Sequence, residues 1–262
     1  GSGCRVMTLL RAIVRFVAFA LISAFVVGSQ TIILPFYRGP KSYWIPWFWQ
    51  WGIRNAFGIR VVVKGAPVKD RQTLYVSNHL SYFDIPVIGS LVMGSFVARG
   101  DMSRWPLFGY MGKMQQTIYI SRDRNDAVEG KNALERKLKD GANLIIFAEG
   151  TSSDGSKVLP FKSSLFSLAI DSPTGKPLAV QPVTISLLNV AGQPAATGAV
   201  RDLYAWHSDM TLWPHIWQFS KLDGATLEVK FHPPRDAAAY RDRKALCNDC
   251  YNDVSGGLAL AA

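Results

Sequence analysis

Short apolar runs alternate with longer mixed segments from about Ile59 to the end of the chain. Such an alternation of strands and helices indicates an α/β fold with a largely parallel, mixed sheet flanked by helices. The apolar runs predict strands at Ile59–Lys64, Thr73–Ser77, Ser95–Ala98, Thr117–Ser121, Asn143–Phe147, Leu178–Ser186 and Thr226–Phe231. The mixed segments predict helices at Ile85–Val92, Arg124–Asp140, Ser163–Ile170, Met210–Phe219 and Asp236–Asn252. The stretch Asn189–Thr197 is predicted as a turn-rich connection.

The first part of the chain has a different pattern. The run Phe16–Leu34 carries no charge, and Arg5, Arg11 and Arg15 precede it. Roughly 20 apolar residues span a bilayer, so this run is a candidate transmembrane or re-entrant helix with a cytoplasmic start. A cleaved signal peptide has a similar basic start, but the run is long for one and no good small-x-small cleavage site follows it.

An aromatic segment, Tyr43–Trp51, comes next and contains half of the eight tryptophans. Indole rings prefer the headgroup region of a bilayer, which predicts an interfacial helix; the alternative is a buried aromatic cluster. A single crossing by Phe16–Leu34 would leave the rest of the protein on the far side, whereas a monotopic helical hairpin would keep everything cytoplasmic. We therefore expect residues 1–58 to form a membrane-anchoring helical segment and residues 59–262 to form the α/β domain.

Composition and charge support a globular domain with a membrane-seeking part. Charged residues make up 18% of the 262 residues, below the roughly 25% of ordinary soluble domains, which excludes intrinsic disorder. The net charge is +10, and nine basic residues precede the first acidic residue, Asp70. A nucleic-acid-binding protein would more often gather such residues on one face of a polar domain. Here the basic residues are interspersed in an apolar segment. This pattern predicts contact with an anionic bilayer and no nucleic-acid partner.

The cysteines give no sign of a disulfide framework or a metal site. Three cysteines, an odd number, fit a reducing compartment. Cys247 and Cys250 form a lone C-x-x-C, and no second pair exists to complete a zinc site. No metal is therefore expected.

A histidine and an aspartate follow the predicted strand Thr73–Ser77, in the segment Asn78-His79-Leu-Ser-Tyr-Phe-Asp84. On a straight helix His79 and Asp84 would point apart, but a tight strand-to-helix turn can fold the carboxylate back onto the imidazole. A carboxylate bound to one ring nitrogen fixes the tautomer and leaves the other nitrogen free as a general base. The alternative is an N-cap aspartate beside an unrelated surface histidine.

A second carboxylate follows the predicted strand Asn143–Phe147. Open α/β sheets gather their ligands at the carboxyl ends of their strands. Glu149, the backbone of Gly150 and Thr151 could hold a hydroxylated head group there. Taken alone, the segment is a turn with a helix cap.

Together these residues resemble the lysophosphatidic acid acyltransferase (PlsC-like) family of glycerolipid acyltransferases. Asn78 and the His79-x4-Asp84 pair match the family's catalytic block. Phe147-Ala-Glu-Gly-Thr151 is similar to its acceptor-binding block, Phe-Pro-Glu-Gly-Thr-Arg, with alanine in place of the proline.

Other blocks occur in the family's order. Ile118-Tyr-Ile-Ser-Arg122 resembles the block whose arginine contacts the anionic group of the acceptor, and Val180-Gln-Pro-Val183 resembles the fourth block. Lys162 ends the segment Pro160-Phe-Lys162, and such enzymes have a similar segment at this place in their sequence. The resemblance covers roughly Leu74 to Ser186, and the ordered set is more specific than any one block.

The resemblance implies a lysolipid O-acyltransferase of membrane lipid biosynthesis. His79 would take the proton of a lysolipid hydroxyl as it attacks the thioester of acyl carrier protein or coenzyme A, with Asp84 steadying the imidazolium. The residues implied to bind substrate are Asn78, Arg122, Glu149, Gly150, Thr151 and Lys162. No cofactor beyond the acyl donor is implied, and the expected location is the inner membrane, with the catalytic domain facing the cytoplasm.

One departure concerns the acceptor. Ser152 stands where the family usually has an arginine, whose planar fork suits phosphate. This version is similar to the lyso-ornithine lipid acyltransferase branch, in which Asp154 could face an ammonium group or simply cap a turn. Arg122 and Lys162 remain available for phosphate, so both lyso-ornithine lipid and 1-acylglycerol-3-phosphate stay open as acceptors.

Two other classes of protein remain as alternatives. A non-catalytic membrane lipid-binding protein would explain the missing arginine. A membrane serine esterase is disfavoured because the sequence lacks Gly-x-Ser-x-Gly.

Overall fold

The computed structural model describes residues 2–100, 108–121 and 124–259. Its centre is a nine-stranded sheet in which seven strands follow the order β1-β8-β6-β2-β5-β3-β4, and β7 and β9 pair with β6. The strands are β1 Ile59–Lys64, β2 Thr73–Ser77, β3 Ser95–Arg99, β4 Ile118–Ile120, β5 Leu144–Phe147, β6 Ala179–Val190, β7 Gln193–Pro194, β8 Ala225–Phe231 and β9 Arg235–Asp236.

The sheet is mixed and largely parallel, as the sequence predicts. Strands β1 and β8 are parallel, and so are the pairs β2–β5, β2–β6, β3–β5 and β3–β4. Antiparallel pairing is confined to β6, which meets β7, β8 and β9 in this way. Because β2 and β5 are parallel and end at the partners Ser77 and Phe147, the two candidate turns leave the same edge of the sheet side by side.

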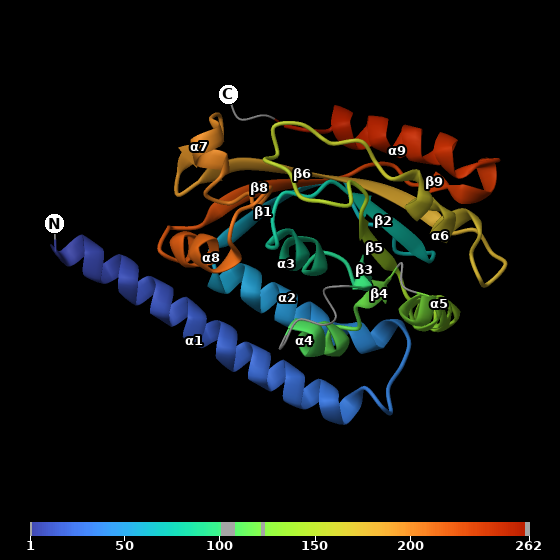
Figure 1. Ribbon diagram of the computed structural model, residues 1–262, viewed down its shortest axis with the longest axis horizontal. Coiled ribbons are helices and arrows are strands. Elements are labelled where there is room, and N and C mark those ends of the chain that lie inside the picture. Colours follow the sequence, from blue (N-terminus) through green and yellow to red (C-terminus); the bar gives the residue numbers. More distant parts are fainter. Residues whose placement is uncertain (1, 101–107, 122–123, 260–262) are drawn as a thin grey trace.

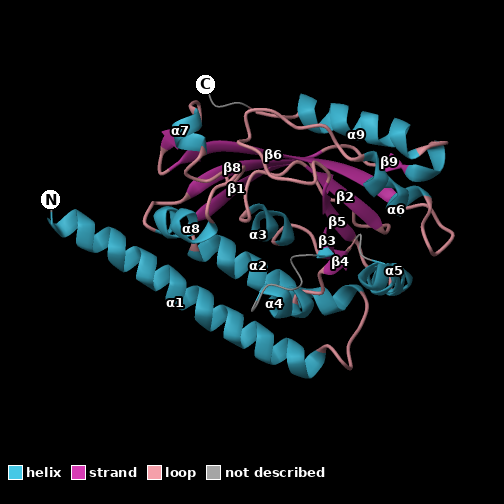
Figure 2. Ribbon diagram, in the orientation of Figure 1, coloured by secondary structure: helices cyan, strands magenta, loops and turns pink. Residues whose placement is uncertain are grey.

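Helices cover both faces of the sheet (Figure 2). The α-helices are α1 Ser2–Ile33, α2 Trp44–Ala56, α3 Asp84–Gly89, α4 Phe108–Met114, α5 Arg124–Lys139, α6 Ser167–Ile170, α7 Gly198–Arg201, α8 Leu212–Ser220 and α9 Arg243–Gly256. Short 3-10 helices occupy Pro40–Tyr43 (η1), Ser163–Phe166 (η3) and Ala237–Ala239 (η4). Helix α9 lies over one face, α2, α3 and α8 lie over the other, and α1 is outermost (Figure 1).

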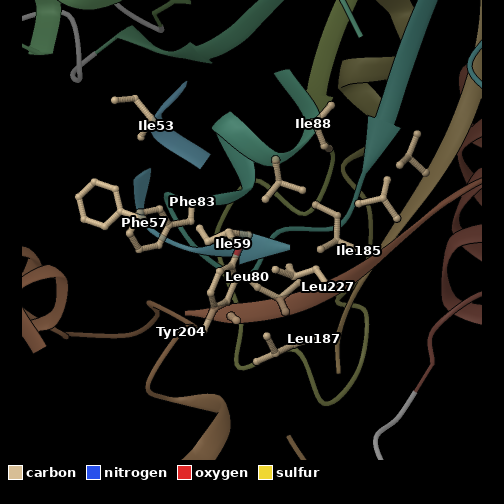
Figure 3. Close-up of a cluster of buried hydrophobic side chains, with 14 of the residues drawn as sticks. Ile53, Phe57, Ile59, Leu80, Phe83, Ile88, Ile185, Leu187, Tyr204 and Leu227 are labelled. Carbon is tan, nitrogen blue, oxygen red and sulfur yellow. The ribbon is translucent and has the colours of Figure 1, made fainter. Parts of the chain in front are cut away.

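Side chains alternate between the two faces of the sheet along each strand, and each face has its own hydrophobic core. On β2, Tyr75 points into one core, and Leu74 and Val76 point into the other. The first core includes Ile53 of α2 and Phe57, which follows this helix, together with residues of α3, α8 and the sheet (Figure 3). The second core lies under α5, α6 and α9.

Most predicted strands and helices lie within a few residues of the observed ones, with two differences. Strand β6 continues to Val190 and returns as β7, so the predicted turn-rich connection Asn189–Thr197 is partly wrong. Ala191 and Gly192 both have positive φ, which suits a two-residue hairpin turn. The predicted helix Asp236–Asn252 begins only at Arg243, where the preceding aspartate caps the helix through its carboxylate.

Helix α1 packs along the body of the protein. Among the described residues it is the one helix long and apolar enough to cross a membrane. Near its start, Arg11 and Arg15 donate to carbonyl oxygens at the end of α8. Further along, Ser23 accepts from the indole N–H of Trp49 at 2.9 Å, and Thr31 meets the hydroxyl of Tyr110 at 3.0 Å.

The tryptophan-rich helix α2 divides between surface and core. Trp44 and Trp51 are exposed, whereas Trp47 and Trp49 are partly buried and donate their indole N–H groups within the protein. Because α2 also shares the first core with β1, the structure packs together the two parts expected on either side of residue 58. The boundary itself stays a prediction.

Candidate active site

The turn between β2 and α3 folds Asp84 back onto His79, which is one of the two arrangements that the sequence left open. The imidazole Nδ1 lies 2.8 Å from Oδ2 of Asp84. The same oxygen accepts the backbone N–H groups of Leu80 at 2.5 Å and Ser81 at 2.9 Å, which pulls the carboxylate into the turn. Because a carboxylate can only accept, Nδ1 donates its proton, and in the neutral imidazole Nε2 keeps its lone pair.

The imidazole is also fixed from one side by an aromatic stack. The rings of His79 and Phe147 lie 4.0 Å apart at 12°, and Phe96 in turn stacks on Phe147 with ring centroids 5.9 Å apart. The His79 side chain is 20% exposed, whereas Asp84 is fully buried. The histidine therefore has a defined orientation and one accessible edge.

Asn78 anchors this turn to the neighbouring strand. Its amide nitrogen donates to the carbonyl of Ile185 at 2.9 Å, and its amide oxygen accepts the N–H of the same residue at 2.8 Å. Both polar atoms of the buried side chain bind β6 in this way. The structure therefore places Asn78 beside the His79–Asp84 pair as a link between β2 and β6.

Glu149 links the turns that follow β2 and β5. One carboxylate oxygen accepts the N–H of His79 at 2.6 Å, and the other accepts the N–H of Leu159 at 2.8 Å. Burial raises the pKa of this carboxyl to about 7, although the two hydrogen bonds favour its charged form. Both oxygens thus bind backbone groups of the site.

The remaining predicted substrate-binding residues are Gly150, Thr151, Lys162 and Arg122. Gly150 has φ of +70°, and the side chain of Lys162 lies so close that a Cβ atom on Gly150 would be 2.6 Å from its Cε. Thr151 and Lys162 are exposed at the carboxyl edge of the sheet. Arg122 lies outside the described residues.

The loop after Thr151 is bonded to a segment that the sequence did not single out. The Ser152 hydroxyl donates to the carbonyl of Trp206, and the Trp206 N–H donates to the carbonyl of Leu80 at 2.8 Å. Asp154 accepts the N–H and hydroxyl of Ser156, which is the geometry of a turn cap, and also meets an arginine of α7.

Tyr204, in the same segment, donates its hydroxyl to Oδ1 of Asp84 at 2.9 Å. The two residues are 120 positions apart in the sequence, and no local pattern predicts that they meet. Sequence reasoning therefore missed Tyr204.

No group of three or more metal-binding side chains occurs in the part of the chain that the structure describes. Cys247 and Cys250 are free and buried on α9. Burial raises the pKa of both thiols, which disfavours the thiolate that a metal would bind.

Comparison with known proteins shows the class of this mixed α/β chain, which is an acyltransferase. The chain belongs to the acyltransferase family, whose model matches residues 60–186. It is 34% identical over 253 residues to a lyso-ornithine lipid O-acyltransferase of Brucella abortus, covering 93% of this chain and 94% of that protein.

Other relatives agree with this assignment. A lyso-ornithine lipid O-acyltransferase of Rhodobacter capsulatus is 32% identical, with 77% of this chain and 71% of that protein covered. A 1-acyl-sn-glycerol-3-phosphate acyltransferase of Neisseria gonorrhoeae is 33% identical, with coverage of 71% and 69%. The crystal structure of the acyltransferase PlsC from Thermotoga maritima has the same fold, with a TM-score of 0.64, 22% identity and coverage of 97% and 95%.

Proposed function

We propose that this acyltransferase moves a fatty acyl group from a thioester to the free hydroxyl of a lysolipid, in the synthesis of membrane lipids. The observation that carries the proposal is the imidazole of His79, whose Nδ1–H is bound by Asp84 and whose Nε2 keeps its lone pair. Such an imidazole is suited to remove a proton from a hydroxyl group.

In the proposed step, Nε2 of His79 accepts the proton of the lysolipid hydroxyl while the hydroxyl oxygen attacks the thioester carbonyl. The ester C–O bond forms, the C–S bond breaks, and the imidazolium returns the proton to the leaving thiolate. Asp84 stabilises the imidazolium between these events. The thioester of acyl carrier protein or coenzyme A supplies the acyl group, and the step needs no further cofactor.

We assign acceptor binding to the Gly150 backbone and to the exposed Thr151 and Lys162. The resemblance of its segment to the family's block adds Arg122 to this assignment. Asn78 and Glu149 have a different role in the proposal. Their polar atoms bind backbone groups of β6 and of the two turns, so they position the site.

The acceptor that we favour is lyso-ornithine lipid. Ser152 replaces the arginine that would bind phosphate, and its hydroxyl is bonded to the Trp206 carbonyl. Relatives from three organisms, Brucella abortus, Rhodobacter capsulatus and Rhizobium meliloti, carry the description lyso-ornithine lipid O-acyltransferase. The alternative acceptor, 1-acylglycerol-3-phosphate, is the substrate class in the name of the Neisseria relatives.

The test is an acyl-transfer assay on the purified full-length chain in detergent. Lyso-ornithine lipid and lysophosphatidic acid are each offered with acyl carrier protein and coenzyme A thioesters. His79→Ala is expected to lower turnover by roughly 10²–10⁴-fold, the usual contribution of a general base. Near-normal turnover in this variant would refute the mechanism, and preference for lysophosphatidic acid would refute the favoured acceptor.

His207→Ala is a matched control for this assay. His207 also pairs with an aspartate, Asp202, through one ring nitrogen at 3.0 Å. It lies outside the proposed site, so its loss is expected to leave turnover unchanged. A similar loss in both variants would show that the effect of His79→Ala is not specific.

We also propose that α1 and α2 form a hairpin in the cytoplasmic leaflet of the inner membrane, with the catalytic domain in the cytoplasm. Two observations support this placement. Helix α1 is bonded to α8, α2 and α4 along its length, so it could cross a bilayer only by leaving the body of the protein. Apolar side chains, including Leu21 and Phe25, remain exposed along it.

A further inference from the structure

The Asp84 carboxylate is bonded on both oxygens, but from different parts of the chain. Oδ2 meets His79 and two backbone N–H groups of its own turn. Oδ1 accepts the hydroxyl of Tyr204, which lies beyond α7. The local turn therefore holds one oxygen, and a distant tyrosine holds the other.

Tyr204 is itself held rigidly. It is fully buried, its backbone N–H donates to the carbonyl of Arg201 at 3.0 Å, and its ring packs against Phe83 and Phe219. Figure 3 shows it beside Leu80, whose carbonyl accepts the N–H of Trp206. The ring is fixed by this packing, so its hydroxyl has little freedom to leave the carboxylate.

The direction of this hydrogen bond is defined. Burial, followed by the charge of Asp84, raises the pKa of the Tyr204 hydroxyl well above its usual value. The phenol therefore stays protonated and donates to the carboxylate.

We infer that Tyr204 is a positioning residue, which fixes the orientation of the Asp84 carboxylate and thereby sets the basicity of His79. This inference rests on the proposed function of the His79–Asp84 pair. A donor on Oδ1 prevents the carboxylate from rotating and takes up part of its negative charge. The imidazolium is then stabilised less strongly than it would be by a carboxylate that lacked this donor.

The principal variant is Tyr204→Phe, which removes the hydroxyl and keeps the ring. We expect kcat to fall roughly tenfold with KM changed less than about twofold, because one hydrogen bond to a charged group is lost. We also expect the pKa of His79 to rise by roughly half a unit or more. Imidazole ¹⁵N NMR titration measures this pKa, with the His79 signals assigned by their loss in His79→Ala.

A direct titration of His79 is needed because other titratable groups face the pair. Glu149, from the turn after β5, accepts the His79 N–H. Tyr82, from the β2–α3 turn, interacts electrostatically with Tyr204 and is bonded to His215 of α8. Their titration would contribute to a pH–rate profile, whereas the NMR signal reports His79 itself.

Tyr75→Phe is the matched control. Tyr75 is also buried in the first core, and its hydroxyl donates to the carbonyl of Val68 at 3.0 Å, away from Asp84. This variant loses a buried tyrosine hydrogen bond that does not involve Asp84, so it is expected to lower stability without changing kcat or the pKa of His79.

Two further measurements separate positioning from a general structural role. In an Asp84→Asn background, Tyr204→Phe is expected to lower kcat little further, because the hydroxyl acts through the carboxylate. Site-specific 3-fluorotyrosine at position 204 keeps the fold and strengthens the donor. This substitution is expected to lower the pKa of His79. If Tyr204→Phe does not fold, the fluorotyrosine protein alone tests the positioning role.

The outcomes are distinguishable. If His79→Ala remains active, the proposed function fails and this inference fails with it. If His79→Ala is inactive but Tyr204→Phe and the fluorotyrosine protein keep the wild-type kcat and His79 pKa, only the role of Tyr204 is overturned. The role of Tyr204 is also overturned if Tyr204→Phe lowers kcat by the same factor in the Asp84→Asn background as in the wild type.

Discussion

At the scale of single residues, the site is built from buried side chains that bind backbone groups. Asn78 binds the strand beside it, Asp84 binds its own turn, and Glu149 joins the turns after β2 and β5. A buried polar group that loses its partner destabilises a protein by about 1–3 kcal/mol. These three residues therefore contribute to the fold as well as to the placement of His79.

Glu149 gives the chain a pH-dependent stability. The pKa of Glu149 is about 7 in the folded protein and 4.5 for an ordinary glutamate, the value taken for the unfolded chain. Between pH 4.5 and 7 the folded chain therefore holds a proton that the unfolded chain has released. The free energy of unfolding is therefore expected to fall as the pH rises from about 4.5 to about 7, by an amount on the order of 3 kcal/mol. Urea unfolding of the wild-type protein across this range measures the fall.

Glu149→Gln is the comparison for this measurement. Glutamine cannot ionise, so the free energy of unfolding of the variant should not show the fall attributed to Glu149 between pH 4.5 and 7. This comparison does not depend on how stable the variant is at any one pH. Parallel profiles for the wild type and the variant would show that Glu149 does not cause the dependence.

At the scale of elements, α1 presents two different faces. One face meets α8, α2 and α4 through hydrogen bonds and packing. The opposite face exposes Val17 and Leu21, which are 52% and 67% exposed. An apolar face of this kind is expected to bury itself in a bilayer interface.

The double variant Val17→Glu, Leu21→Glu tests this contact without disturbing the packed face. We expect it to sediment far less with anionic vesicles than the wild type does, because two charges would enter the apolar region of the bilayer. Val128→Glu on α5 is the control, since Val128 is also 62% exposed but lies on another helix. Undiminished sedimentation of the double variant would contradict the proposed placement of α1.

At the scale of the whole molecule, charge is distributed unevenly along the chain. The net charge is +10, and nine basic residues precede the first acidic one. Each lysine or arginine near an anionic membrane contributes about 1 kcal/mol, and salt screens this attraction.

Binding to vesicles that contain anionic lipid is therefore expected to weaken roughly tenfold or more between low and high salt. Vesicles of zwitterionic lipid alone are the control and are expected to bind weakly in both conditions. Salt-independent binding to the anionic vesicles would show that the apolar face, and not the charge, determines the affinity.

Much of the fold follows from local pattern, and so does the centre of the site. The strands have clear apolar runs, and His79 and Asp84 meet because they lie only five positions apart in one turn. Other features depend on tertiary packing that no local pattern contains. The pairing of Asn78 with Ile185 requires the register of β2 and β6, and the contact of Tyr204 with Asp84 joins positions 120 residues apart.

The partners of α1 impose an order of events on synthesis of the chain. Arg11 and Arg15 emerge from the ribosome early, but the carbonyl groups that they bind belong to Ser220, Lys221 and Leu222, near the other end. At about 5–20 residues per second, these partners appear roughly ten seconds or more later. During that interval the first helix has no α8 to pack against, so early cover by a lipid surface or a chaperone would protect the nascent chain from aggregation.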